Sequence, residues 1–353
     1  MISHKNSPVP EMKVVSYAFP AKKVDCIFHA SMQDLKEKFD PATTVFLTDK
    51  NIAAAHPQKL EGYRTITIEP GEKFKQQSTI DAVIRQLIDW EINKEDTLVG
   101  IGGGVISDLA GYAASIYKRG MNLVLVPTSL LAMIDASLGG KNGVDVGAYK
   151  NMAGTIYQPA SIWYDFDFLN TLPVEEWKNG MAEMIKHACI ADEGMFEFLE
   201  SLNLHRIMDD PALVADLVER NVGIKMDIVT RDEFDMHDRQ LLNFGHTIGH
   251  AIEKLLDLPH GHAVSIGMVS ACALSEKAAN LDFEEAAKIV SILAQYQLPV
   301  DIETDIDKVF EALRKDKKRS GNDINFVLIN KIGSAFAKKI PVEFIRQNLK
   351  NLL

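Results

Sequence analysis

Short, strongly apolar runs alternate with amphipathic segments along the first half of the chain, and this alternation limits the fold more than any other feature. Several runs are too apolar to alternate buried and exposed side chains, which is typical of a parallel sheet that helices cover on both faces. The runs are Val45–Leu47, Thr65–Ile68, Thr97–Ile101, Leu123–Val126 and Ile162–Tyr164. We therefore expect an α/β layer built on a parallel sheet.

One amphipathic segment between the second and third runs shows the helical period. Its apolar residues recur at i, i+3, i+4, i+7 and i+8, which places them on one face of a helix. Ser78 lies ahead of this stripe, and its hydroxyl is the expected N-cap. The stripe consists of Ile80, Val83, Ile84, Leu87 and Ile88.

A mainly helical pattern replaces the alternation after about Leu172. One late β-like run, Ile324–Leu328, is the exception. A chain of 353 residues is long enough for two compact domains of about 150 residues each. We expect an α/β domain over residues 1–172 and a mainly helical domain over residues 173–353. The expected helices are Glu175–Cys189, Ala212–Val229, Leu241–Leu256, Ala263–Ala279, Glu284–Gln295 and Ile306–Leu313.

Charge and cysteine content indicate which partners and which compartment to expect. Lys and Arg number 38 against 49 Asp and Glu, a net charge of −11, and a surface this acidic disfavours nucleic-acid binding. Cys26, Cys189 and Cys272 are far apart and form no C-x-x-C pair, so we expect three reduced thiols. The first residues lack the apolar core of a secretory signal, and no run approaches ~18 apolar residues, the length of a membrane span. We therefore expect a cytoplasmic protein with neither membrane nor nucleic-acid partners.

Three consecutive glycines, Gly102-Gly103-Gly104, join the expected strand Thr97–Ile101 to a helical pattern that opens at Val105. A strand, a glycine turn and a helix bring backbone N–H groups against a phosphate, and a Cβ in the turn would block that approach. The spacing is not G-x-G-x-x-G, and the acidic strand end at Asp49 precedes the turn instead of following it. Nucleotide binding and a simple tight turn therefore both stay open.

Four of the ten histidines lie between residues 246 and 262. His246 and His250 are four residues apart on an expected helix, so their rings share one face, a spacing suited to a metal ion. His260 and His262 follow on a short turn. A lone helical histidine is usually structural, but this cluster favours metal or acid–base chemistry, with Glu183 as a candidate third ligand.

Glu183 itself belongs to a polar stripe. Asn179, Glu183 and Lys186 lie at i, i+4 and i+7, on one face of an expected helix. The alternative is a solvated face that carries an i, i+3 ion pair.

Single cations lie in turn-like or helix-end contexts along the chain. In an acidic protein such cations can bind an anionic substrate if they converge, although most lysines are simply exposed. They are Arg119, Lys141, Lys150, Lys186, Lys225, Arg239 and Lys317.

A series of motifs gains meaning from its order. The earlier motifs are Gly102–Gly111, Tyr117–Gly120, Val126–Leu131, Asp135–Ser137, Gly139–Lys141, Lys150–Asn151 and Tyr157–Pro159. The later motifs are Thr171–Pro173, Gly180–Lys186, Leu242–Glu253, His260–Gly261 and Asp316–Lys318. No single motif would suffice, but together they resemble the 3-dehydroquinate synthase family over roughly residues 40 to 330.

The resemblance implies a fold, an activity and two cofactors. The family has an α/β domain followed by a mainly helical domain, binds NAD and a divalent metal (zinc, with cobalt as the alternative), and is expected to act as a homodimer. It converts 3-deoxy-D-arabino-heptulosonate 7-phosphate, an anionic sugar phosphate, to 3-dehydroquinate with loss of phosphate.

The resemblance also implies roles for individual residues. Glu183, His246 and His260 match the metal ligands, and three protein ligands leave room for substrate oxygens. His250, Lys141 and Asp235 match catalytic residues, and Asp235 stands where the family usually has Glu. Cofactor positions match Asp49, Glu72, Lys75, Gly103, Gly104, Val105, Asp108, Thr128, Ser129 and Lys150. Substrate contacts match Arg119, Asp135, Lys141, Asn151, Asn179, Lys186, Lys225, Arg239, Asn243 and Lys317.

Three departures from the family pattern bear on substrate choice. Asn142 stands where Thr is common, His237-Asp238 where Gly-Leu is usual, and His262 where Glu is common. Another sugar-phosphate cyclase is therefore an alternative. A metal-dependent polyol dehydrogenase and an inactive binding protein are two further alternatives that do not depend on these departures. The intact ligands and cations argue against the last, because a binding scaffold has no physical need for them.

Overall fold

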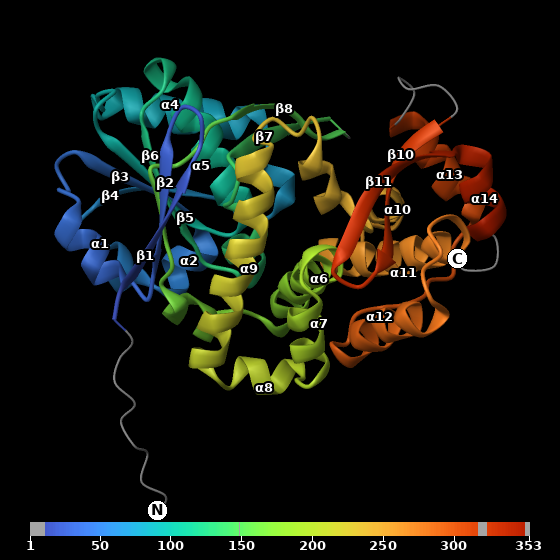
Figure 1. Cartoon of the computed structure of the whole chain (residues 1–353). Coiled ribbons are helices and arrows are strands. Elements are labelled where there is room, and N and C mark those ends of the chain that lie inside the picture. Colours follow the sequence, from blue (N-terminus) through green and yellow to red (C-terminus); the bar gives the residue numbers. More distant parts are fainter. Residues whose placement is uncertain (1–10, 148, 317–322, 350–353) are drawn as a thin grey trace, which may run out of the picture. The chain divides into compact units, whose positions relative to one another are not determined.

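The computed structural model describes residues 11–147, 149–316 and 323–349 (Figure 1). They form two compact units, the first containing residues up to Thr128 with Gly139–Thr171, the second Ser129–Leu138 with the residues from Leu172 onward. Residues 129–138 thus pack with the helical unit and not with the α/β unit to which the sequence assigns them. The reason is close packing, since a Cβ on Gly180 would come within 2.5 Å of Leu130.

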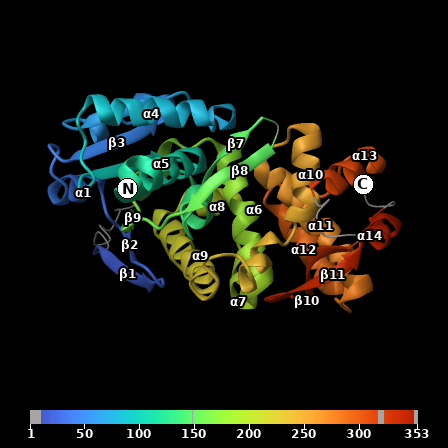
Figure 2. The ribbon, with the colours of Figure 1, turned by 90° about the horizontal axis from the view of Figure 1, so that it is seen from above.

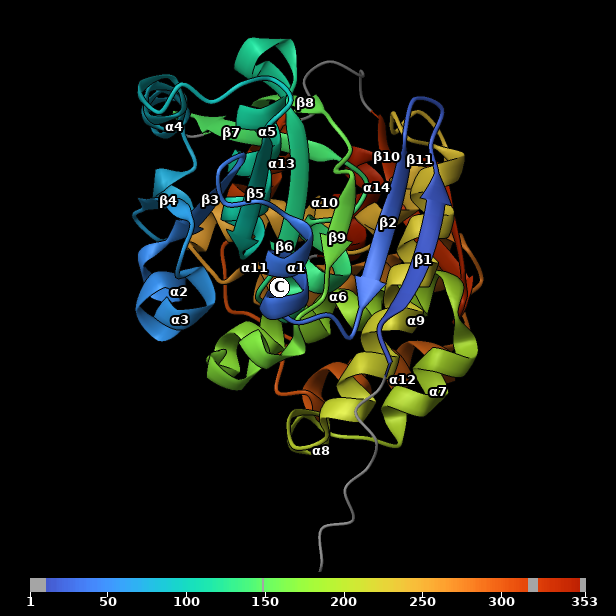
Figure 3. The same cartoon turned by 90° about the vertical axis from the view of Figure 1, so that its left-hand side faces the viewer.

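A seven-stranded sheet forms the centre of the first unit, in the order β1-β2-β9-β6-β5-β3-β4 (Figure 3). Neighbours from β2 to β4 in this order pair in parallel, and β1 is antiparallel to β2. The strands are β1 (Lys13–Ala18), β2 (Lys23–Phe28), β3 (Thr44–Asp49), β4 (Arg64–Ile68), β5 (Thr97–Gly102), β6 (Asn122–Pro127) and β9 (Ser161–Trp163). The five expected strands are confirmed as β3, β4, β5, β6 and β9. The β1–β2 hairpin was not expected, because β1 is an edge strand with mostly exposed side chains.

Helices flank this sheet, and their apolar faces meet strand residues such as Phe46 and Val99 in one core. They are α1 (Met32–Lys38), α2 (Lys50–Ala55), α3 (Pro57–Leu60), η1 (Glu72–Phe74), α4 (Gln77–Asp89), α5 (Gly104–Ile116), η2 (Tyr117–Arg119) and η4 (Phe166–Thr171). The expected cap of α4 is wrong, since the helix starts at Gln77 and Ser78 lies inside it. A β-bridge between Gln76 and Asp145 holds the preceding residue extended, so the helix begins after it.

A second, two-stranded sheet lies alongside α5 in the same unit (Figure 2). It consists of β7 (Lys141–Val146) and β8 (Tyr149–Ile156), which pair in antiparallel fashion. This hairpin was also missed, because glycines and polar residues interrupt both strands.

The second unit is mainly helical, as expected. Its helices are η3 (Ala132–Ala136), α6 (Val174–Ala191), α7 (Glu193–Glu200), α8 (Leu204–Met208), α9 (Pro211–Arg231), η5 (Asp238–Asn243), α10 (His246–Leu256), α11 (His260–Ala278), α12 (Phe283–Gln295), α13 (Ile306–Asp316) and α14 (Val342–Leu349). A hairpin of β10 (Asp323–Lys331) and β11 (Ser334–Pro341) completes it. The fold class expected from the sequence is thus confirmed. No helix within the described ranges is long and apolar enough to span a membrane.

Two helix starts in this unit differ from expectation by three or more residues. α10 begins at His246 and not at Leu241, because Gly245 adopts a left-handed conformation (φ 78°) where a Cβ would lie 2.7 Å from Met268 Cγ. α11 begins at His260, three residues before the expected start, so His260 and His262 belong to the first turn of a helix and not to a loop.

Candidate active site

A polar stripe is buried inside α6. Asn179, Glu183 and Lys186 expose 7%, 0% and 1% of their surface. The solvated-face alternative is therefore wrong, although its ion pair exists, since Nζ of Lys186 contacts Oε2 of Glu183. Burying a carboxylate and an ammonium group is costly unless each is paired, so the stripe indicates a site and not a surface.

Two histidines converge on the Glu183 carboxylate within the second unit. Oε1 of Glu183 lies 3.3 Å from Nε2 of His246 and 3.2 Å from Nε2 of His260. One ligand atom from each of the three residues lies within 4.8 Å of the others, which fits a single divalent cation. His246 and His260 are the first residues of α10 and α11, so two helix starts position two of the three candidate ligands.

The far ring nitrogens of both histidines are engaged as well. Nδ1 of His246 lies 3.1 Å from the carbonyl oxygen of Phe244, and Nδ1 of His260 lies 3.5 Å from Oε2 of Glu253. With a metal ion bound in place of the Nε2 proton, a proton held at Nδ1 would leave the Nε2 lone pair of each ring for coordination.

The charges around Glu183, His246 and His260 favour a cation between these three side chains. Burial would raise the pKa of Glu183, but Lys186 and His246 hold it well below its usual range. Burial would lower the pKa of His260, but hydrogen bonds to Glu183 and Glu253 raise it to about 10. Two carboxylates thus stabilise a cation at this ring, and a bound metal ion would meet the same demand.

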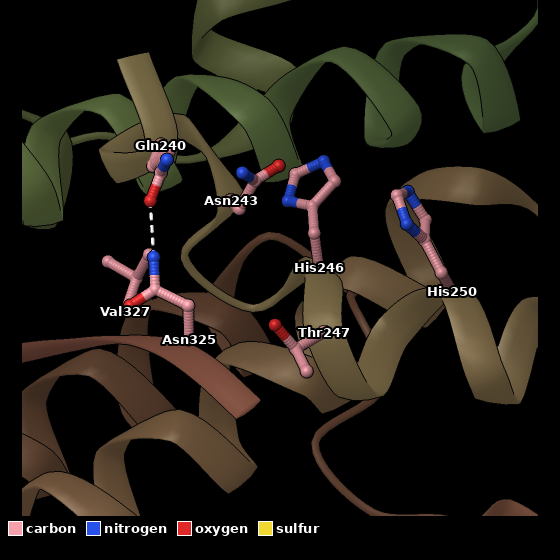
Figure 4. Close-up of a pocket in the computed structure, with 7 residues that line it drawn as sticks. All are labelled: Gln240, Asn243, His246, Thr247, His250, Asn325 and Val327. Carbon is pink, nitrogen blue, oxygen red and sulfur yellow. Dashed lines mark hydrogen bonds between the residues drawn. The ribbon is translucent and has the colours of Figure 1, made fainter. Parts of the chain in front are cut away.

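His250 lines a pocket of about 240 Å³ beside these residues (Figure 4). Its ring centroid lies 5.0 Å from that of His246 and 6.2 Å from that of His260. Desolvation and these two rings lower the pKa of His250, which keeps the ring neutral. The other lining residues are Gln240, Asn243, His246, Thr247, Asn325 and Val327.

Four of these lining residues were missed by the sequence analysis. Asn325 and Val327 lie on β10, and the amide of Asn325 donates to the Gln240 side chain across the pocket wall (Figure 4). Gln240 precedes the motif Leu242–Glu253 and Thr247 lies inside it, but neither was assigned a role. Their role depends on a contact between η5 and β10 that no local signal in the sequence predicts.

A second charged cluster surrounds Asp135 on η3. Nζ of Lys225 donates to Oδ1 of Asp135 at 2.7 Å and to its backbone oxygen at 2.6 Å. Nζ of Lys186 lies 3.8 Å from the same carboxylate, and Nε2 of His187 lies 3.4 Å from it. Burial would raise the pKa of Asp135, but Lys225 and Lys186 hold it well below its usual range. Because Lys186 also contacts Glu183, the two lysines balance two carboxylates, and a cation bound by Glu183 would leave positive charge for an anionic ligand.

The loop between α9 and η5 carries Asp235, and Arg239 follows as the second residue of η5. The Asp232 carboxylate accepts hydrogen bonds from the backbone N–H groups of Met236 at 2.9 Å, His237 at 2.6 Å and Arg239 at 3.1 Å. Asp235 has a left-handed backbone (φ 60°), and Arg239 is buried and donates to the Glu233 carbonyl oxygen at 2.6 Å. The loop is therefore held by one carboxylate anchor.

Two further residues, Asn179 and Lys317, were expected to contact the substrate. Asn179 accepts a hydrogen bond at 3.0 Å from the backbone N–H of Gly261, which joins α6 to the start of α11. Lys317 lies outside the described residues. His262 points away from the three candidate ligands, with Nε2 at 3.5 Å from Oε2 of Glu175.

The glycine turn of the first unit offers an anion site. Gly103 precedes α5, whose N-terminus has no side-chain cap, so the N–H groups of its first turn, at Gly104 and Val105, are available to a phosphate. The backbone N–H of Thr128 donates to the Gly102 carbonyl oxygen at 3.0 Å, which places the end of β6 beside the turn.

Four residues expected to bind cofactor or substrate meet near this helix. Lys75 is buried, contacts the carboxylate of Asp108, and donates to Oδ1 of Asn151 at 2.6 Å. Glu72 lies 3.8 Å from the same Nζ. Burial would lower the pKa of Lys75, but Asp108 and Glu72 raise it, so this side chain stays charged.

The remaining candidates are more dispersed. Asp49 caps α2 by accepting from the N–H groups of Asn51 at 2.8 Å and Ile52 at 3.0 Å. Ser129 belongs to the second unit, where its hydroxyl accepts from the N–H of Ala132 at 3.2 Å. The exposed candidates are Arg119 on η2, Lys141 on β7 and Lys150 on β8.

Two family models match consecutive parts of the chain. Residues 65–179 match the model of the 3-dehydroquinate synthase N-terminal domain, and residues 180–319 match that of the C-terminal domain. The chain belongs to the 3-dehydroquinate synthase family. A relative in this family, the 3-dehydroquinate synthase of Clostridium beijerinckii, is 37% identical over 88% of this chain and 92% of its own. That of Campylobacter concisus is 40% identical over 83% of this chain and 86% of its own.

A solved structure shares the fold over nearly the whole chain. It is the 2-epi-5-epi-valiolone synthase of Streptomyces hygroscopicus subsp. jinggangensis with NAD+ and Zn2+ bound, which superimposes with a TM-score of 0.84 at 25% identity. The match covers 98% of this chain and 99% of the other. An enzyme with a different printed activity therefore shares this fold.

Proposed function

We propose that this chain is an enzyme that converts 3-deoxy-D-arabino-heptulosonate 7-phosphate to 3-dehydroquinate and phosphate, a lyase step of the shikimate pathway. Family membership supports the reaction. The observation that carries it is the convergence of Glu183, His246 and His260 beside a buried pair of lysines, because this places a cation site next to charge that suits an anionic sugar phosphate.

The residues in the second unit fit a divalent metal, zinc or cobalt. Glu183, His246 and His260 would hold it, since their ligand atoms converge and both rings direct Nε2 to the carboxylate. When bound, such an ion makes a coordinated hydroxyl group more acidic. Around it, Lys186 balances the buried charge of Glu183, and Glu253 keeps the His260 ring oriented.

The first unit fits NAD, which a relative of the same fold binds. The uncapped start of α5 would bind its pyrophosphate, and glycine at residues 103 and 104 allows the close approach. When bound, NAD would supply reversible hydride transfer, which leaves the reaction without net redox change. Asp108 and Lys75 would contact the remainder of the cofactor, with Asp49, Glu72, Val105, Thr128, Ser129 and Lys150 as further candidates.

Chain residues would bind the substrate and move its protons. Lys225 and Lys186 supply positive charge for its anionic groups, and Asp135 keeps both lysines in place. His250, neutral and open to the pocket, would take a proton, and Asp235 would assist. The other proposed substrate contacts are Arg119, Lys141, Asn151, Asn179, Arg239, Asn243 and Lys317.

We further propose that the chain acts as a homodimer in the cytoplasm. Exposed apolar side chains on the β7–β8 hairpin, Tyr149 and Met152 at 59% and 67% exposure, support self-association. Three buried free cysteines support a reducing compartment. Sedimentation equilibrium of the purified chain tests the dimer, and a single species at the monomer mass would contradict it.

The activity is tested by incubating the purified chain with the heptulosonate phosphate, NAD and zinc. We expect phosphate and 3-dehydroquinate in equal amounts, both far exceeding the enzyme-bound NAD, with no lasting rise in NADH absorbance. NADH that accumulates one-to-one with turnover would indicate a polyol dehydrogenase. Phosphate release from another sugar phosphate, but not from this one, would indicate a different cyclase. The Glu183→Gln variant, which removes a candidate ligand charge, is the inactive control.

A further inference from the structure

Asn142 is a buried amide next to the candidate substrate residue Lys141. It is the second residue of β7 and only 9% exposed, so its side chain points into the protein and not toward a ligand. Its Nδ2 donates to two carbonyl oxygens, that of Gly140 at 2.7 Å and that of Tyr157 at 3.0 Å. One amide group thus joins the residue before Lys141 to the residue that follows β8.

These hydrogen bonds close the turn that carries Lys141. Gly139 and Gly140 both have left-handed backbones, with φ of 83° and 66°, a conformation that glycine adopts at little cost but that needs fixing. The backbone N–H of Tyr157 also donates to the Gly140 carbonyl oxygen, at 2.8 Å. The Gly140 peptide is therefore held from two sides, and Lys141 leaves the turn in a defined direction.

Gly111 on α5 creates the space for this amide. A Cβ at residue 111 would lie 1.8 Å from Oδ1 and 2.2 Å from Cγ of Asn142, distances that real side chains never reach. The Asn142 side chain is thus seated directly on the glycine face of α5. Any larger residue at 111 must push it off the two carbonyl groups.

We propose that Asn142 is a positioning residue for Lys141, and that Gly111 is required because it seats the Asn142 amide. The inference deepens the proposed function and rests on it in one respect, the role of Lys141 as a substrate-binding cation. Two donor hydrogens on one nitrogen let Asn142 serve both carbonyl groups, whereas the single hydroxyl of Thr, common at this position in the family, can donate to one at most. The departure at residue 142 therefore changes how Lys141 is held.

The variants Asn142→Ala and Asn142→Asp test this positioning. Alanine removes the amide. Aspartate keeps its shape, but its carboxylate oxygens only accept hydrogen bonds and so cannot donate to the two carbonyl groups. We expect KM for the heptulosonate phosphate to rise about 10-fold to 100-fold, the range for a lost buried hydrogen bond, while NAD affinity stays unchanged. Asn122→Ala is the matched control, since Asn122 is an amide of the same unit whose Nδ2 donates to Thr97 at 2.9 Å, away from the turn. It should leave KM unaltered.

Two double variants separate positioning from a merely structural role. If Asn142 acts through Lys141, then Asn142→Ala adds little to a chain that already carries Lys141→Met. If Gly111 acts through Asn142, then Gly111→Ala raises KM in the wild-type chain but causes no further rise in a chain that already carries Asn142→Ala. If the effects on KM are fully additive in the first pair, Asn142 does not act through Lys141. If they are fully additive in the second pair, Gly111 does not act through Asn142. A normal KM in both single variants at residue 142 would overturn the whole inference.

Binding without turnover separates this inference from the proposed function. The dissociation constant of the heptulosonate phosphate, measured by calorimetry, should rise in Asn142→Ala as KM does. A wild-type chain that binds this compound but releases no phosphate would refute the proposed function, while a weakened affinity in Asn142→Ala would still support the positioning. Equal affinity in wild type and variant, or no binding by either, would overturn the positioning.

Discussion

At the scale of single residues, the two histidines of the first turn of α11 have different surroundings. Nε2 of His260 faces Glu183 at 3.2 Å, whereas Nε2 of His262 lies 3.5 Å from Glu175 on the other side of the turn. We expect His260→Ala to lose most of the bound metal and nearly all activity, because two ligands remain. His262→Ala serves as the matched control and should retain metal. Elemental analysis of both purified variants decides, and a metal-free His262→Ala beside a metal-loaded His260→Ala would show that the ligand assignment is wrong.

Lys225 makes substrate binding depend on pH. Its burial, with the positive charges of Lys186 and Arg239 nearby, lowers its pKa to about 8 although Asp135 opposes this. Below that pH the ammonium is charged and attracts an anion, and above it the charge is lost. We therefore expect KM for the sugar phosphate to stay level between about pH 6.5 and about pH 7.5. Above about pH 8 it should rise, approaching a tenfold increase for each pH unit.

Lys225→Arg is the matched comparison for this pH profile. A guanidinium stays charged through this range, so the variant should show a flatter KM profile even if its KM is higher overall. A wild-type KM that stays level up to about pH 9.5 would show that Lys225 contributes no charge to substrate binding.

At the scale of elements, the start of α10 depends on Gly245. Its φ of 78° and the proximity of Met268 Cγ at 2.7 Å and Val264 O at 2.9 Å leave no room for a Cβ. Gly245→Ala should therefore displace His246, weaken metal binding at least tenfold and lower the melting temperature. Gly223→Ala is the control, because Gly223 lies within α9 with nothing near its Cβ position, and there alanine should stabilise by about 0.5–1 kcal/mol. Metal titration and thermal unfolding measure both, and an unchanged metal affinity in Gly245→Ala would contradict the expectation.

The same elements show what the sequence could and could not predict. Strands β3, β5 and β6 follow from apolar runs, because a sheet covered on both faces needs continuous apolar strands. The helix boundaries at His246 and His260 do not, because they depend on packing of Gly245 and Gly261 against other helices. The spacing of Glu183 and the histidines identified a candidate metal site, but the pocket wall formed by Gln240 and Asn325 depends on a tertiary contact.

At the scale of the whole molecule, the three cysteines report on both units. Cys26 lies in the first unit, and Cys189 and Cys272 lie in the second; all three are buried and free. Burial raises the pKa of Cys26 to about 12 and also raises the pKa of the other two thiols.

A thiolate is the reactive form of cysteine, so a buried thiol with a raised pKa reacts slowly. We expect no thiol of the native protein to react with a disulfide reagent near neutral pH, and three to react in concentrated guanidinium chloride. A rapidly reacting thiol in the native chain would contradict the burial.

Because one thiol belongs to the first unit and two to the second, the number of thiols exposed at intermediate denaturant concentration also tells which unit unfolds first. A step of one thiol would mean that the α/β unit unfolds first, and a step of two that the helical unit with the candidate metal site does. Since a ligand stabilises the state that binds it, added zinc should delay the exposure of Cys189 and Cys272 but not that of Cys26.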